Sequence, residues 1–265
     1  MSKAILVDVT KCYGCGACTV ACKLWNGKKY DDAKKPTVGE NAQLADINWT
    51  VVSKHRVADA SGKTVWRFAK KQCLHCKEPA CASSCLVGAL RKTEGGPVVY
   101  YPDLCVGCRY CMIACPFGIP KYEWDKSFPE VSKCQMCSGR LAKNEAPACV
   151  SVCPNSAMKF GDSEQILKDA RAAIASDKRY VKHIYGEKEA GGTAWMYISD
   201  QPFDKLGFKA TVKNRPLPEY TWKIINKIPA ALVVWSGILT GVYMITKRRD
   251  AVKSSKNSEG KGGKP

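Results

Sequence analysis

The chain has 265 residues, enough for one or two compact domains with a buried core, so its fold need not depend on disulfide bonds. Its 42 Lys and Arg against 24 Asp and Glu give a formal net charge of +18, an excess typical of proteins that bind nucleic acids or anionic membranes. Apolar residues make up 45% and charged residues 25%, which excludes a wholly disordered chain and a fibrous repeat. The 16 cysteines are too many for an ordinary globular protein and too sparse for a small secreted disulfide scaffold.

The cysteines form four groups of four along the chain. In order, the groups are Cys12, Cys15, Cys18 and Cys22; Cys73, Cys76, Cys81 and Cys85; Cys105, Cys108, Cys111 and Cys115; and Cys134, Cys137, Cys149 and Cys153. The first and third groups have two, two and three residues between successive cysteines. This spacing is typical of chains in which three thiolates on a tightly curved loop bind one [4Fe-4S] cluster and the fourth cysteine binds a neighbouring cluster.

The residues around the cysteines support this interpretation. Gly14, Gly16 and Gly107 allow the backbone to wrap around a cluster and to point its N–H groups at sulfur. Proline follows the last cysteine of the third and fourth groups, as in the bacterial cluster-binding run, but does not follow that of the first and second.

Three other uses of the thiols fit the sequence less well than clusters do. Disulfides are disfavoured because neighbouring CxxC pairs are too close to make good structural bridges. Zinc sites also use CxxC pairs, but a third cysteine only two residues further on does not match zinc-ribbon spacing. Buried reduced cysteines do not explain four regular groups. The pattern favours four [4Fe-4S] clusters, and a membrane-tethered zinc or disulfide scaffold is the alternative of another class.

Residues 24–71 form a long insertion between the first two groups. Segments 48–54 and 64–70 have strand-like composition and flank the turn signal Ala60-Ser61-Gly62. We expect a surface hairpin that packs on a partner, with a plain loop as the alternative. In the fourth group, a loop with Arg140, Lys143 and Asn144 is expected to lie beside a cluster.

After the last cysteine, apolar residues recur at helical spacing from Asp162 to Ala175. Asp162, followed three residues later by Gln165, is a capping signal. We therefore expect an amphipathic helix on the surface of the domain.

Nineteen residues from Ile228 to Thr246 carry no charge and, as a helix, are long enough to cross the hydrocarbon core of a bilayer. A buried helix of a soluble protein is the alternative. We expect one transmembrane helix over residues 223–247 and a basic, flexible tail over 248–265. Because the span contains no His or carboxylate, it offers no haem ligand, and quinone chemistry is expected in another subunit. Gly237 and Gly241 form a GxxxG pair, either by chance or as a packing face.

The charges that flank the span predict its orientation. Within 20 residues of the span, seven Lys and Arg lie on its C-terminal side and five on its N-terminal side. This bias predicts a cytoplasmic tail and a cluster domain on the outer, periplasmic face of the inner membrane. Since residues 1–12 contain neither an apolar signal segment nor a twin-arginine pair, the domain is expected to cross together with a partner that carries the signal.

The paired motifs predict an α+β fold of two bacterial-ferredoxin-like units with insertions over residues 1–160. An amphipathic helix and docking segment (161–222), the membrane helix and the tail follow. The order of the cysteine groups, the segment HIYGEKEAGGTAWMYI from His183 to Ile198 and the single C-terminal span resemble one family. It comprises the four-cluster iron–sulfur subunits of membrane-bound respiratory oxidoreductases, such as the beta subunit of formate dehydrogenase and the electron-transfer subunit of membrane-bound nickel–iron hydrogenases. The resemblance covers the chain except the lysine-rich tail and part of the insertion.

The resemblance implies which cysteines share a cluster, because the first group pairs with the fourth and the second with the third. The implied ligand sets are Cys12, Cys15, Cys18 and Cys153; Cys134, Cys137, Cys149 and Cys22; Cys73, Cys76, Cys81 and Cys115; and Cys105, Cys108, Cys111 and Cys85. Since every implied ligand is a cysteine here, four [4Fe-4S] clusters are expected and no [3Fe-4S] cluster.

In such a family, electrons pass from a catalytic molybdopterin or nickel–iron subunit through the clusters to an integral membrane cytochrome or quinone-reactive subunit. The resemblance implies the same partners here, with the formate dehydrogenase type favoured over a hydrogenase or another molybdopterin oxidoreductase. The chain alone is not expected to be an enzyme, because it has no nucleotide fingerprint and no recognisable catalytic residues. No nucleic-acid partner is expected, since DNA binding would be sensitive to salt and would not need a membrane span.

Charged side chains next to the thiols could raise the reduction potential of a cluster. Lys11, Lys77, Arg109 and Lys133 stand there, and solvated surface charges are the equally weighted alternative. His75 lies between two expected ligands and is expected to be a surface residue rather than a hydrogen-bond donor to a cluster. His55 and His183 show no partner pattern.

Overall fold

The computed structural model describes residues 2–31, 33–59, 62–124, 126–127 and 129–259. A three-stranded sheet has β1 (Lys3–Asp8) at its centre, with β9 (Met158–Asp162) antiparallel on one side and β10 (Trp195–Ile198) parallel on the other. Successive side chains of a strand point to opposite faces, and both faces of β1 are apolar because both are buried. Ile5 and Val7 pack into the main core, whereas Ala4 and Leu6 pack on the other side.

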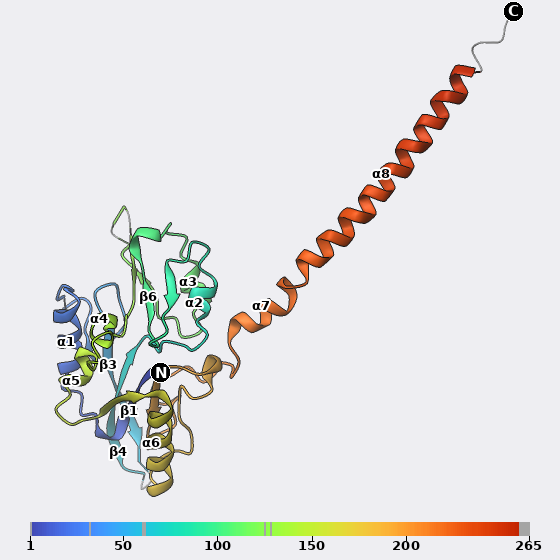
Figure 1. Ribbon diagram of the computed structural model, residues 1–265. Helices are drawn as coiled ribbons and strands as arrows, with labels where there is room; N and C mark the ends of the chain where they lie inside the picture. The colour runs from blue at the N-terminus through green and yellow to red at the C-terminus, as the bar shows by residue number, and fades with distance from the viewer. Residues whose placement is uncertain (1, 32, 60–61, 125, 128, 260–265) are drawn as a thin grey trace, which may run out of the picture. The chain divides into compact units, whose positions relative to one another are not determined.

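The second face of this sheet is covered by α6 (Ser163–Ser176), which runs beside β1 (Figure 1). Ile166 and Ala170 are its buried residues and pack with Ala4 and Leu6. The predicted amphipathic helix is therefore confirmed. Asp162 precedes the helix but makes no capping hydrogen bond, because its carboxylate accepts a hydrogen bond from Lys3 Nζ at 2.9 Å instead.

The insertion contains the predicted hairpin, with β3 (Thr50–Ala58) antiparallel to β4 (Thr64–Gln72) and β2 (Val38–Gly39) parallel to β3. Ala60 and Ser61 of the predicted turn lie outside the described residues. The expected surface position is wrong for the half of the hairpin that contains Val51, Val52 and Ala69, which is buried in the domain. Two adjacent valines bury a strand on both faces, a pattern typical of interior strands.

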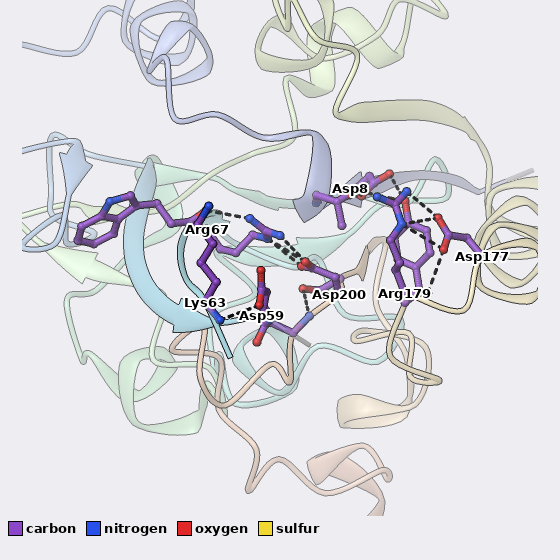
Figure 2. A network of polar contacts seen from close by, with 12 residues as sticks. Asp8, Asp59, Lys63, Arg67, Asp177, Arg179 and Asp200 are labelled. Atoms are coloured by element: carbon purple, nitrogen blue, oxygen red, sulfur yellow. Dashed lines mark hydrogen bonds and ion pairs between the residues drawn. The ribbon is translucent and has the colours of Figure 1, made fainter. Parts of the chain in front are cut away.

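An ion pair fastens the hairpin to the chain segment after β10 (Figure 2). Arg67 Nε on β4 donates to Asp200 Oδ1 at 2.9 Å and Oδ2 at 3.0 Å, and Arg67 Nη2 donates to Oδ2 as well. A bidentate arginine–carboxylate pair fixes geometry as well as charge. The hairpin and the C-terminal strand therefore position one another.

Short elements surround the cysteines. The strands pair as β5 (Leu90–Lys92) with β6 (Val98–Tyr100) and β7 (Lys121–Tyr122) with β8 (Val131–Ser132). The helices are α1 (Ala17–Trp25), α2 (Ala80–Ser83), α3 (Tyr110–Ala114), α4 (Ser138–Leu141) and α5 (Ala148–Ser151), with 3-10 turns at Val9–Lys11, Pro102–Leu104 and Glu189–Gly191. These α and β elements agree with the predicted α+β class.

A compact unit extends from Met1 to Pro218. The boundary expected at residue 160 lies inside this unit, because β10 pairs with β1 and α6 packs on the same sheet. Residues 161–218 thus belong to the body of the domain.

The remaining residues form a separate unit from Glu219 onward. It contains all but the first two residues of α7 (Leu217–Ile225) and the whole of α8 (Ile228–Glu259). Residues 217–253 include one stretch long and apolar enough to cross a membrane. The helix continues past the expected end at 247 as far as Glu259, so residues 248–259 are helical rather than a flexible tail, and 260–265 lie outside the described residues.

Candidate metal centres

The first and third cysteine groups are built alike. Each begins directly after a 3-10 turn, at Cys12 after Val9–Lys11 and at Cys105 after Pro102–Leu104. Each then starts a helix from a residue in the left-handed region, Gly16 at φ 76° before α1 and Arg109 at φ 61° before α3. This sharp turn places successive thiols around one point, and only glycine adopts it without strain.

The second and fourth groups share another local structure. In both, a Pro-Ala-Cys sequence starts a short helix, with Cys81 on α2 and Cys149 on α5. Within the CxxC pairs, His75 and Met136 occupy equivalent positions, both are buried, and both have left-handed backbone at φ 51° and 54°. The domain therefore contains two copies of the same pair of cysteine motifs.

The thiols gather into four sites, each with three cysteines of one group and the last cysteine of another. One cavity is lined by Cys12, Cys15, Cys18 and Cys153, a second by Cys22, Cys134, Cys137 and Cys149, and another by Cys85, Cys105, Cys108 and Cys111. Cys73, Cys76, Cys81 and Cys115 are close enough for their charges to interact. The sets brought together are those that the family resemblance implies.

We number these sites by their position in space. Site 1 contains Cys12, site 2 contains Cys149, site 3 contains Cys73 and site 4 contains Cys108. Charges interact between Cys18 of site 1 and Cys149 of site 2.

Two further contacts link site 2 to site 3 and site 3 to site 4. Cys134 of site 2 packs in one apolar cluster with Cys73 and Cys115 of site 3. Cys81 of site 3 interacts electrostatically with Cys111 of site 4. The sites therefore form a row from 1 to 4.

Burial disfavours an isolated thiolate at most of these positions. Desolvation, reinforced by neighbouring thiolates, raises the pKa of Cys18, Cys22 and Cys81 to about 12 and that of Cys111 to about 11. Thiolates gathered this closely need strong positive charge between them, which metal ions provide.

The donor set fits iron–sulfur ligation. All sixteen thiols are free, and backbone N–H groups already point at some sulfurs, as Ala89 N does at Cys85 Sγ (3.2 Å) and Met136 N at Cys134 Sγ (3.3 Å). Such bonds stabilise charge on sulfur. Within the described part of the chain, no three His, Cys, Asp or Glu side chains converge on a single-ion site.

Comparison with known proteins shows the family. Two models, both described as a 4Fe-4S dicluster domain, match residues 11–89 and 64–163. A protein of Nitratidesulfovibrio vulgaris is 41% identical over 97% of this chain and 70% of its own length. The formate dehydrogenase iron–sulfur subunit of Haemophilus influenzae is 34% identical over 89% of this chain and 77% of its own. The chain belongs to the 4Fe-4S dicluster iron–sulfur subunits.

The hydrogenase-2 operon protein HybA of Shigella flexneri is a further relative, 33% identical over 77% of this chain and 72% of its own.

The surface position expected for His75 in this dicluster subunit is wrong. Its side chain is 0% exposed, Nδ1 accepts a hydrogen bond from Val98 N at 2.9 Å, and Nε2 is buried without a hydrogen-bond partner. The acceptor role of Nδ1 places the proton of a neutral imidazole on Nε2. Burial lowers the pKa of His75 well below its ordinary value, followed in effect by the charges of Lys133 and Lys92.

The four cations expected beside the thiols fall into two classes. Lys11, Lys77 and Arg109 are exposed. Lys133 is 2% exposed, and its Nζ donates to Cys134 O at 3.0 Å and to Val98 O, so it is no solvated surface charge.

The dicluster domain contains one more buried cation, which was not predicted from the sequence. Lys70 is 2% exposed and lines the cavities of both site 1 and site 2. The sequence feature that could have identified Lys70 is its position on a hairpin strand, three residues before Cys73. Because the hairpin was expected to lie on the surface, Lys70 was expected to be exposed.

Proposed function

We propose that this protein holds four [4Fe-4S] clusters and conducts electrons between a catalytic subunit and a membrane partner. The proposed ligands are Cys12, Cys15, Cys18 and Cys153 at site 1; Cys22, Cys134, Cys137 and Cys149 at site 2; Cys73, Cys76, Cys81 and Cys115 at site 3; and Cys85, Cys105, Cys108 and Cys111 at site 4. The observation that carries the proposal is the row of four four-thiol sites, with exposed Cys15 in the first and exposed Cys108 in the last. Electrons would enter and leave at these ends.

When bound, the clusters supply one-electron redox chemistry. The chain itself fixes their spacing, donates N–H groups to sulfur and excludes water from the inner sites, where Cys134, Cys149 and Cys73 are buried. We propose no substrate chemistry for this chain, and the reaction belongs to the partner.

The names of the relatives suggest the partner. One is an iron–sulfur subunit of formate dehydrogenase, and another is a hydrogenase-2 operon protein. We favour a molybdopterin subunit of the formate dehydrogenase type, with a nickel–iron hydrogenase or another molybdopterin oxidoreductase as the alternative. The catalytic subunit that co-purifies with the intact complex distinguishes them.

The apolar helix suggests how electrons reach the membrane. Residues 217–253 include a stretch that could span a bilayer as a single anchor. We propose that it spans the inner membrane, with Lys247, Arg248 and Arg249 on the cytoplasmic side and the cluster domain on the periplasmic side. There the domain would meet a cytochrome or quinone-reactive subunit. Release of a helix-free domain by osmotic shock tests this orientation.

Metal analysis tests the cofactor content. After anaerobic purification, we expect a brown protein with about 16 iron and about 16 acid-labile sulfide per chain. Fewer than about 8 iron per chain would contradict four clusters. A colourless protein that contains zinc or disulfides would support the scaffold alternative, and salt-sensitive DNA binding without membrane retention would support a nucleic-acid role.

A further inference from the structure

Lys70 is a buried cation with no carboxylate partner among the described residues. It lies near the end of β4, opposite Val52 in the hairpin, and is 2% exposed. Lysine is almost never fully buried unless its charge is compensated, since an unpaired ammonium pays a large desolvation cost. Among the described residues, groups other than Asp and Glu therefore lie close enough to compensate Lys70.

The neutral groups around Lys70 hold it in one place. Its Nζ donates to Thr50 Oγ1 at 2.7 Å and to Gln72 Oε1 at 2.8 Å, and lies 4.6 Å from the centre of the Trp195 ring. Gln72 Nε2 in turn donates to Tyr197 Oη at 2.6 Å, which fixes the amide with its oxygen toward Lys70. These contacts orient the ammonium but carry no full negative charge.

The negative charge comes from the thiols on either side. Lys70 lines the cavity of site 1 and also that of site 2. The buried cysteines of these cavities include Cys18 at site 1 and Cys22, Cys134 and Cys149 at site 2. The ammonium therefore lies between two sets of cluster-binding thiols.

We propose that Lys70 is the shared counter-charge of sites 1 and 2 and that it raises the reduction potentials of the clusters held there. The proposal rests on the proposed function, because it needs clusters at both sites. Reduction adds one electron and no proton to a site that is already negative. A fixed positive charge in a low-dielectric interior favours the more negative, reduced state. The insertion that supplies β4 thus has an electronic role as well as a structural one.

Redox titration of the full-length chain in its purified complex, followed by electron paramagnetic resonance, tests the proposal. Dithionite supplies the electrons. Lys70→Met keeps the length of the side chain and removes its charge. We expect two of the four midpoint potentials to fall, so that at a fixed solution potential the ratio of reduced to oxidised cluster drops at least tenfold, which is about 59 mV for a one-electron couple. Lys70→Arg should leave both potentials near their original values.

A second variant offsets the positive charge of Lys70 without removing the side chain. Gln72→Glu places a carboxylate of the same size against Lys70 Nζ, and Tyr197 Oη can donate to it. It should lower the same two potentials. Lys71→Met is the matched control, since Lys71 Nζ bonds to Gly207 O and neither site 1 nor site 2 is lined by it.

Unchanged midpoints in an iron-replete Lys70→Met or Gln72→Glu chain would overturn the proposal. Loss of iron from Lys70→Met but not from Lys70→Arg would support it, because only the charge separates the two. Loss of iron from both would show that Lys70 acts through packing and would also overturn it. Absence of iron from the unmodified chain would instead refute the proposed function.

Discussion

A chain that ends at Pro218 is expected to lose membrane retention while it keeps its full iron content. All sixteen cysteines lie before this point, inside the compact unit Met1–Pro218, whereas the apolar stretch within residues 217–253 is almost entirely removed. If this stretch spans the membrane, it anchors the protein in an effectively irreversible way, and the described residues before Leu217 contain no second helix of this kind. When the chain is co-expressed with its signal-bearing catalytic partner but without the integral membrane subunit, osmotic shock should release the truncated domain with about 16 iron per chain.

A chain that ends at Lys253 is the control, because it keeps the apolar helix and should stay in the membrane fraction after a carbonate wash. Retention of the truncated chain in membranes from cells that lack the partner subunits would contradict the anchor. Its appearance in the cytosol, with a signal-bearing partner present, would contradict the proposed orientation.

Cys149→Ala is expected to remove one cluster and to interrupt the row. Cys149 lies buried in site 2, the second of the four sites, so its loss should lower the iron content by about 4 per chain. Mutations of groups that merely support a metal ligand lower metal affinity or activity roughly 10–100-fold. Loss of a ligand itself, in the middle of the row, should therefore reduce the rate of electron transfer to the membrane acceptor more than about 100-fold. Reduction of a soluble dye directly by the catalytic subunit should persist.

Ser151→Ala is the matched control, since Ser151 lies exposed on the same short helix α5 and lines no cavity of sites 1, 2 or 4. It should keep both the iron and the activity. If Cys149→Ala retained turnover with the membrane acceptor despite the missing iron, site 2 would not lie on the electron path.

The cysteine sites could be predicted from the sequence because the features that form them are local in the chain. The two-residue spacings and the glycines in left-handed backbone lie within single cysteine groups, and the Pro-Ala-Cys helix starts do so as well. The gathering of Cys153 with Cys12, or of Cys22 with Cys134, is not local, and only the family resemblance implied it. The amphipathic helix and the hairpin followed from periodicity in the same way.

The burial of the polar residues could not be predicted from the sequence in this way. Whether His75, Lys133 or Lys70 is exposed depends on which segments pack over it, and periodicity within one strand or loop does not contain that information. The hairpin shows the reason most clearly. Its far end is exposed, but the half near Thr50 and Gln72 is buried beside Trp195 and Tyr197, which are more than 120 residues away in the sequence.

Rapid-freeze electron paramagnetic resonance on the purified complex shows whether electrons pass through all four sites. After the donor of the catalytic subunit is added without an acceptor, we expect all four clusters to become reduced at least as fast as the complex turns over. Addition of a quinone analogue should then reoxidise them. Four clusters that stay oxidised, or that change more slowly than turnover, would show that electrons do not pass through the four sites.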